Sequence, residues 1–225
     1  MSVLLGRYVL PLSQLPRTRR NLTRLAEALV SATPLTLTID VDELSFAEFA
    51  RIVDPARPLW LTLRGEHPEL PPMIAHATQG GARVTLETDG CVNAGRAYAL
   101  IGAGLAELLV DVHHGDPERY PSLERVFRSV ERLVAMRDAN RKPGPAVALR
   151  LTLTRDNASE LHTLMDLCHQ RFQAVQPRVA LADTVPFGDD TVRAALQRAR
   201  KQALRQGALY TLASIDAARD RLTQG

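Results

Sequence analysis

The alternation of apolar and polar residues between positions 59 and 90 predicts a strand, a short helix and a second strand. Residues 59–63 alternate leucine with other side chains, and a period of two is typical of a strand. A helix is expected over Met73–Thr78, ended by Gly80-Gly81, and a strand over 84–88, ended by Asp89-Gly90. Two strands joined by a helix indicate parallel pairing.

The same alternation continues along the chain and predicts six strands separated by helices. The other strands are expected at 35–40, 107–113, 146–154 and 178–183, and the other helices at 21–29, 46–52, 94–101, 120–138, 158–172, 189–206 and 211–222. This order predicts an α/β protein with one mostly parallel sheet. We expect residues 1–34 to form an N-terminal strand and helix extension, residues 35–206 the six-stranded body and residues 207–225 a C-terminal helix.

Five of the predicted strands have polar residues on one face, although parallel strands covered by helices are normally apolar on both. These residues are Thr36, Thr38, Asp40, Thr62, Arg64, Glu66, Thr85, Glu87, Asp89, Asp111, His113, Arg150, Thr152 and Thr154. A curled sheet has a lumen that can hold a polar ligand. The pattern therefore favours a partial (β/α)6 TIM-like barrel with a ligand-sized lumen. The alternatives are phasing that is wrong by one residue, or internal ion pairs such as Arg150 with Asp111.

Arg150 is expected to pair with acidic side chains, because a guanidinium does not lose its charge and needs acidic partners when it is buried. Asp111 and Glu66 are the expected partners by strand order and phase, with His113 in the same cavity. We predict a lumen rim formed by Glu66, Asp89, Asp111, His113 and Arg150 as the ligand-binding residues.

Composition excludes several classes of protein. The net charge is +3, only two residues are lysine, and 4% of the residues are aromatic, which argues against a nucleic-acid-binding platform. No apolar run reaches membrane-spanning length, and the N-terminal segment lacks the features of a signal peptide. The two cysteines, Cys91 and Cys168, offer no disulfide framework. We expect a cytoplasmic protein without nucleic-acid or membrane partners.

Several loops at predicted strand ends resemble motifs of the radical S-adenosylmethionine (SAM) superfamily. Residues 64–70 resemble its Gly-Gly-Glu-Pro corner, Thr88-Asp89-Gly90 its Thr-Asn-Gly corner and residues 110–118 its Ser-Leu-Asp-Gly segment, while Asn157–Leu161 and Pro186-Phe187-Gly188 also stand in family-like places. The resemblance covers about residues 35–188 and implies a six-stranded partial barrel.

The departures from the family concern its cofactors. The family holds a four-iron, four-sulfur cluster with three cysteines spaced C-x-x-x-C-x-x-C after the first strand, and residues 40–49 contain no cysteine. Cys91 and Cys168 do not supply the missing thiolates, and Cys168 is expected to be a buried apolar side chain. Arg64 stands for the first Gly of the Gly-Gly-Glu-Pro corner and His67 for its Pro. We therefore expect no iron–sulfur cluster and leave SAM binding open.

These observations predict a radical-SAM-like pseudoenzyme, with no catalytic residue and no metal ligand assigned. It would act as a partner or substrate-binding subunit in the biosynthesis of a modified peptide or cofactor, together with a catalytic subunit, a peptide substrate or a second copy of itself. One alternative is an enzyme that reuses the lumen with a metal, for which Asp111 and His113 are candidate ligands. The other is a sensor of a small metabolite, SAM included.

Overall fold

The computed structural model describes residues 2–5, 8–11, 23, 35–89, 92–172 and 175–223. Two short strands, β1 (Ser2–Leu5) and β2 (Tyr8–Pro11), form an antiparallel pair. The predicted helix near Asn21, and Cys91, lie outside the described residues. No helix among the described residues is both long and apolar enough to cross a membrane.

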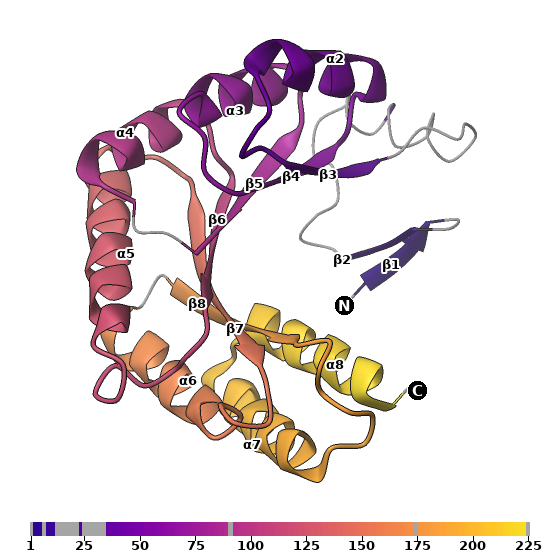
Figure 1. Cartoon of the computed structure of the whole chain (residues 1–225), viewed down its shortest axis with the longest axis vertical. Helices are drawn as coiled ribbons and strands as arrows, with labels where there is room; N and C mark the ends of the chain where they lie inside the picture. Colours follow the sequence, from indigo (N-terminus) through magenta and orange to yellow (C-terminus); the bar gives the residue numbers. More distant parts are fainter. Residues whose placement is uncertain are drawn as a thin grey trace. The chain divides into compact units, whose positions relative to one another are not determined.

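The remaining strands and helices alternate along the chain, as predicted (Figure 1). The elements are β3 (Thr36–Asp40), α2 (Phe46–Ala56), β4 (Trp60–Arg64), α3 (Leu70–Gln79), β5 (Arg83–Thr88), α4 (Ala94–Gly102), β6 (Glu107–Val112), α5 (Ser122–Ala139), β7 (Ala146–Leu153), α6 (Glu160–Arg171), β8 (Val175–Leu181), α7 (Asp190–Gln206) and α8 (Leu209–Thr223). The sheet has the strand order β3-β4-β5-β6-β7-β8. The pairs β3–β4, β6–β7 and β7–β8 are parallel. The chain is thus an α/β protein whose strand order is that of a partial (β/α)6 barrel.

The boundaries of some elements differ from the prediction for local reasons. Helix α3 begins at Leu70 rather than Met73, because Pro71 and Pro72 stand in its first turn, where a missing N–H removes no helical bond. Helix α2 continues past Ile52 to Ala56 and ends at Arg57, which has a left-handed conformation. Its predicted N-terminus is confirmed: Ser45 and Glu48 form a reciprocal capping box.

The chain forms two compact units. Unit 1 comprises residues 1–86 and 102–106, and unit 2 comprises residues 87–101 and 107–225. In unit 1, the side chains of β4 that point to the core (Leu61, Leu63) and those of α3 (Met73, Ile74) are fully buried. In unit 2, the core contains Leu108, Phe127, Leu133, Leu149, Leu151 and Leu164.

The predicted phasing of the strands is confirmed. In β7, Val147, Leu149, Leu151 and Leu153 are buried, whereas Arg150 and Thr152 on the opposite face are half-buried. The same division separates Leu61 and Leu63 from Thr62 in β4, and Val84 and Leu86 from Thr85 in β5. The apolar set therefore fills the core, and the polar set lies on the other face of the sheet.

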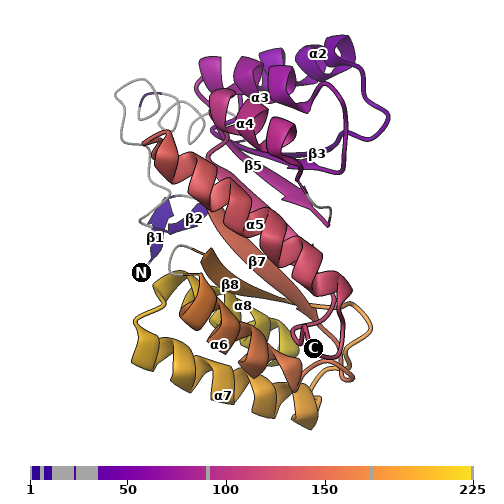
Figure 2. The same cartoon turned by 90° about the vertical axis from the view of Figure 1, so that its left-hand side faces the viewer.

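Helix α8 covers the free edge of β8, which ends the sheet. The N–H of Val179 donates to Ser214 Oγ at 3.2 Å, and Arg221 Nη1 donates to the carbonyl of Leu181 at 3.2 Å. Figure 2 shows α6, α7 and α8 gathered beside β8. Unpaired edge groups invite association with another strand, so α8 satisfies an edge that the sheet leaves open.

Candidate functional site

An ion-pair cluster lies on the polar face of the sheet in unit 2. Arg150 Nε and Nη2 donate to the two carboxylate oxygens of Asp111 at 2.5 and 2.8 Å. Arg150 Nη1 and Nη2 donate to the two oxygens of Glu87 at 3.1 and 3.0 Å. The side chain of Arg150 is 23% exposed and that of Glu87 13%. One guanidinium therefore holds two carboxylates from two other strands.

The register of the sheet explains this cluster. Asp111 on β6 is paired directly with Arg150 on β7, so their side chains leave the same face about 5 Å apart. Glu87 projects from β5, the next strand beyond β6. Hydrogen bonds that Arg150 donates to Asp111, and then to Glu87, raise its pKa above the ordinary value, against the opposing effect of burial.

A second ion pair continues the cluster along the same face. Arg178 on β8 is in register with Arg150, and its Nη2 donates to the carboxylate of Glu107. Each arginine is thus matched to acidic side chains on strands one or two places away in the sheet. The polar face of unit 2 is stabilised by internal ion pairs, one of the two alternatives to a ligand-sized lumen that the sequence left open.

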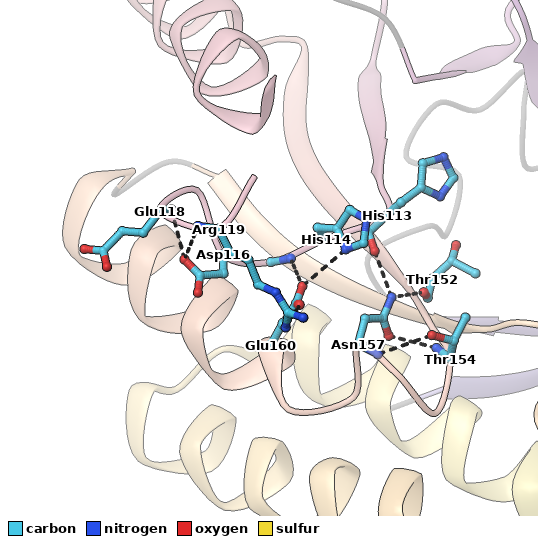
Figure 3. Close-up of polar contacts among 10 residues, drawn as sticks. His113, His114, Asp116, Glu118, Arg119, Thr152, Thr154, Asn157 and Glu160 are labelled. Atoms are coloured by element: carbon cyan, nitrogen blue, oxygen red, sulfur yellow. Dashed lines mark hydrogen bonds and ion pairs between the residues drawn. The ribbon is translucent and has the colours of Figure 1, made fainter. Parts of the chain in front are cut away.

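The carboxyl ends of β6 and β7 form a rim pocket of about 280 Å³. Its lining residues are His113, His114, Arg119, Tyr120, Thr152, Thr154, Asp156 and Asn157. His113 is exposed, and in Figure 3 its ring extends away from the carboxylate of Glu160. Ligands of parallel α/β proteins bind at this end of the strands, so this pocket is the candidate functional site.

Asn157 ties the two strand ends of the rim pocket together. Its Nδ2 donates to the carbonyls of His113 at 2.8 Å and of Thr152 at 2.9 Å, and its Oδ1 accepts the N–H of Thr154 at 2.8 Å. Only 5% of Asn157 is exposed. A buried amide with these bonds fixes the distance between the backbones of β6 and β7 at the point where the rim pocket begins.

Glu160, at the start of α6, holds the loop after β6. Its Oε2 accepts the N–H of Gly115 at 2.9 Å, and Arg119 Nη1 approaches Oε1 at 3.5 Å (Figure 3). Gly115 passes so close to α6 that an added Cβ would lie 2.4 Å from the carbonyl oxygen of Glu160. The loop therefore needs glycine at this position because of the close backbone approach.

His114 lies between this carboxylate and an aromatic ring. Its imidazole stacks on Tyr120 with 3.4 Å between the ring centroids. Its Nδ1 is 3.6 Å from Glu160 Oε2, too far for a hydrogen bond, and is buried without a hydrogen-bond partner among the described residues. The ring is thus positioned by stacking on Tyr120, beside the carboxylate of Glu160.

In unit 1, the corner that resembles Gly-Gly-Glu-Pro is closed by the loop after β3. Asp42 Oδ1 accepts the N–H of Glu66 at 2.7 Å, and a Cβ on Gly65 would lie 2.1 Å from the same oxygen. Glu69 Oε2 accepts the N–H of Phe46 at 3.1 Å. The carboxylate of Asp42 therefore occupies the space directly beside this corner.

The predicted site residues are distributed between these features. Asp111 and Arg150 lie together in the ion-pair cluster, His113 lines the rim pocket, and Glu66 and Asp89 are exposed. The predicted pairing of Arg150 with Asp111 is confirmed. The sequence predicts Glu66 as the second carboxylate, and in the structure Glu87 fills this role because β5 adjoins β6 whereas Glu66 follows β4. Binding by these residues stays a prediction.

Two residues that organise the rim, Asn157 and Glu160, were noted in the sequence only as part of a family-like segment. Their partners lie 44 and 45 positions earlier, at His113 and Gly115. The local signal for them is a run of polar residues, 154–157, between β7 and α6. The predicted burial of Cys168 is confirmed, and burial raises the pKa of its thiol to about 12.

No protein-family model matches the chain, and no curated protein matches it. Among solved structures, it is similar to an HpcH/HpaI aldolase from Desulfitobacterium hafniense, with 15% identity and a TM-score of 0.44 over 82% of this chain and 79% of that one. It is also similar to a xylose isomerase domain protein from Planctomyces limnophilus (13% identity, TM-score 0.45, 73% of this chain and 69% of that one). A third similar structure is the dihydropteroate synthase of Thermus thermophilus, with 16% identity and a TM-score of 0.40 over 91% of this chain and 73% of that one. Likenesses at this level bear neither on activity nor on ligand.

Proposed function

We propose that the chain is a cluster-free relative of the radical SAM enzymes that serves as a partner or substrate-binding subunit in the biosynthesis of a modified peptide or cofactor. The observation that carries this proposal is the loop between β3 and α2. By the resemblance, this loop corresponds to the family's cluster-binding loop, and its five residues, 41–45, include no cysteine.

The chemistry of this loop does not fit an iron–sulfur cluster. Such clusters need several thiolates, and the side chains here serve the fold instead. Ser45 accepts the N–H of Glu48 to cap α2, and Asp42 accepts the N–H of Glu66. A carboxylate beside Gly65 also competes for the space in which the family places the methionine part of SAM.

The scaffold of the rim pocket, in contrast, is held by internal hydrogen bonds. Asn157 and Glu160 hold the strand ends and the loop after β6 with buried hydrogen bonds. An ordered rim in a chain that lacks cluster-binding thiolates suits a protein that binds rather than reacts. Strand β3 supports a partner role as well, because it is an end strand of the sheet and Thr36, Thr38 and Asp40 are exposed.

The test is co-expression with the products of neighbouring genes, followed by affinity purification and mass photometry of the purified mixture. We expect a defined complex whose catalytic subunit loses activity on the peptide or cofactor precursor when this chain is omitted. A strictly monomeric protein that turns over a substrate by itself would contradict the proposal.

A second function, binding of a small polar metabolite without chemistry, is favoured by the rim pocket. The pocket is lined by the polar residues Thr152, Thr154, His113 and Arg119. A small number of precisely placed polar groups is typical of ligand pockets. A thermal-shift screen of metabolites, repeated on Thr152→Val, tests it. A hit that stabilises both proteins equally would place the ligand elsewhere.

A further inference from the structure

A second and larger pocket lies in unit 2 at the amino end of β8, away from the carboxyl-end rim. Its volume is about 610 Å³, and α6, β8 and the junction of α7 with α8 form its walls. Phe172, Val175, Pro177 and Met165 supply apolar surface. Of the lining residues that the structure describes, none is acidic.

The N-terminus of α8 forms one wall of this pocket. Leu209, Tyr210 and Thr211, the first three residues of the helix, all line it. The first regular helical bond runs from the N–H of Leu212 to the carbonyl of Ala208 at 2.9 Å. The N–H groups of Tyr210 and Thr211 precede that bond, and a helix leaves such groups to external acceptors. They carry the positive end of the helix dipole, which favours an anion.

Thr211 supplies an independent indication of a ligand. Thr211 is 1% exposed and is one of the residues that line the pocket. Its Oγ1 has no hydrogen-bond partner among the described residues. A buried hydroxyl without a partner is unfavourable. A bound acceptor at the helix N-terminus would satisfy the hydroxyl and the two N–H groups together.

We propose that this pocket binds a small carboxylate with an apolar body. The carboxylate would accept hydrogen bonds from Thr211 Oγ1 and from the N–H groups of Tyr210 and Thr211, and the body would lie against Phe172 and Val175. Neutralisation of the anion needs no lysine or arginine, because the helix end supplies the partial positive charge. The site is separate from the rim pocket and does not depend on the function proposed above.

The first test uses phenylacetate as the probe and phenylacetamide, its uncharged analogue, as the ligand control. Binding is measured by isothermal titration calorimetry at low ionic strength. We expect phenylacetate to bind about tenfold more tightly than the amide. Equal affinity of the two compounds, or no heat with phenylacetate, would overturn the proposal.

Two variants locate the site. Thr211→Val keeps the shape and removes the unpartnered hydroxyl, so the fold should be at least as stable while phenylacetate binding weakens roughly fivefold. Ala208→Asp places a carboxylate before the first residue of α8, where it can accept the free N–H groups, and should abolish phenylacetate binding while raising Tm.

The matched control is Thr223→Val, which removes an exposed hydroxyl from the same helix. It should leave the affinity for phenylacetate unchanged. If Thr211→Val and Ala208→Asp bind phenylacetate as the native protein does, the ligand occupies another place and the proposal is wrong.

Discussion

Arg150 binds two carboxylates at once, and this determines what each of the three side chains contributes. Four of its hydrogen bonds are used by Asp111 and Glu87. Two carboxylates this close to each other repel unless a cation lies between them. The guanidinium is therefore a structural link between three strands, and a ligand that displaced it would have to replace both pairs.

Replacement of Arg150 by Met should destabilise the protein by about 2–3 kcal/mol, because it leaves two half-buried carboxylates facing each other. Urea unfolding followed by circular dichroism measures the change. The triple variant Glu87→Gln, Asp111→Asn, Arg150→Met should recover most of the loss, since it removes the charges together. A single variant as stable as the native protein would show that water already satisfies these carboxylates.

Gly115→Ala should cost about 1–3 kcal/mol, because the new Cβ meets backbone that has little room to move. The same shift would lengthen the bond from the N–H of Gly115 to Glu160. Gly102→Ala is the matched control: nothing lies within 4 Å of the added Cβ, and this glycine is in α4. Denaturant midpoints of the two variants should therefore differ clearly, and equal midpoints would contradict the close approach.

At the scale of helices, Arg171 joins α6 to α5. Its guanidinium donates to Glu131 at 2.7 Å and to both oxygens of Glu124 at 2.7 and 2.9 Å. It also lies over the rings of Phe127 and Phe172, at 5.5 and 5.4 Å from their centroids. The link thus combines charge and apolar contact on the surface of unit 2.

This link makes a pH-dependent contribution to stability. Hydrogen bonds from Arg171, and then from Arg128, lower the pKa of Glu124 from 4.5 to about 2. A folded-state pKa below the unfolded value stabilises the protein at higher pH, and the contribution is lost as the pH falls through this interval. Glu124→Gln should therefore lower Tm at neutral pH, and its difference from the native protein should vanish between pH 4.5 and about pH 2. Glu118, an exposed carboxylate, forms no ion pair among the described residues. Its replacement, Glu118→Gln, should show no such convergence.

The helices and strands could be predicted because their signals are local. Capping by Ser45 and Glu48, the period of two in β7 and the glycine after α7 each act within a few residues. The role of α8 could not be predicted, because its bonds to β8 join Val179 with Ser214 and Leu181 with Arg221. Such pairings depend on packing that no local pattern encodes.

For the molecule as a whole, strand phase predicted which residues share a face but not which of them meet. Asp111 and Arg150 were paired correctly, because direct neighbours in register follow from strand order. The choice of Glu66 over Glu87 was wrong because both have the correct phase, and only the position of β5 beside β6 distinguishes them. The pocket at the start of α8 was missed, because a helix N-terminus shows in sequence mainly through the capping residue that is absent here.

SAM itself can test whether the corner of unit 1 is closed. If the Asp42 carboxylate closes the corner at Gly65 and Glu66, added SAM should leave Tm within about 1 °C. A ligand present at about one hundred times its Kd stabilises the folded state by about 2.7 kcal/mol, which would raise Tm by roughly 5–10 °C in a chain of this size. Differential scanning fluorimetry at millimolar SAM therefore separates micromolar binding from its absence.

Asp42→Ala, which removes the carboxylate, is the informative variant: a SAM-dependent rise in Tm in this variant alone would show that Asp42 blocks the site. A rise of several degrees in the native protein would contradict the closed corner and favour a SAM sensor.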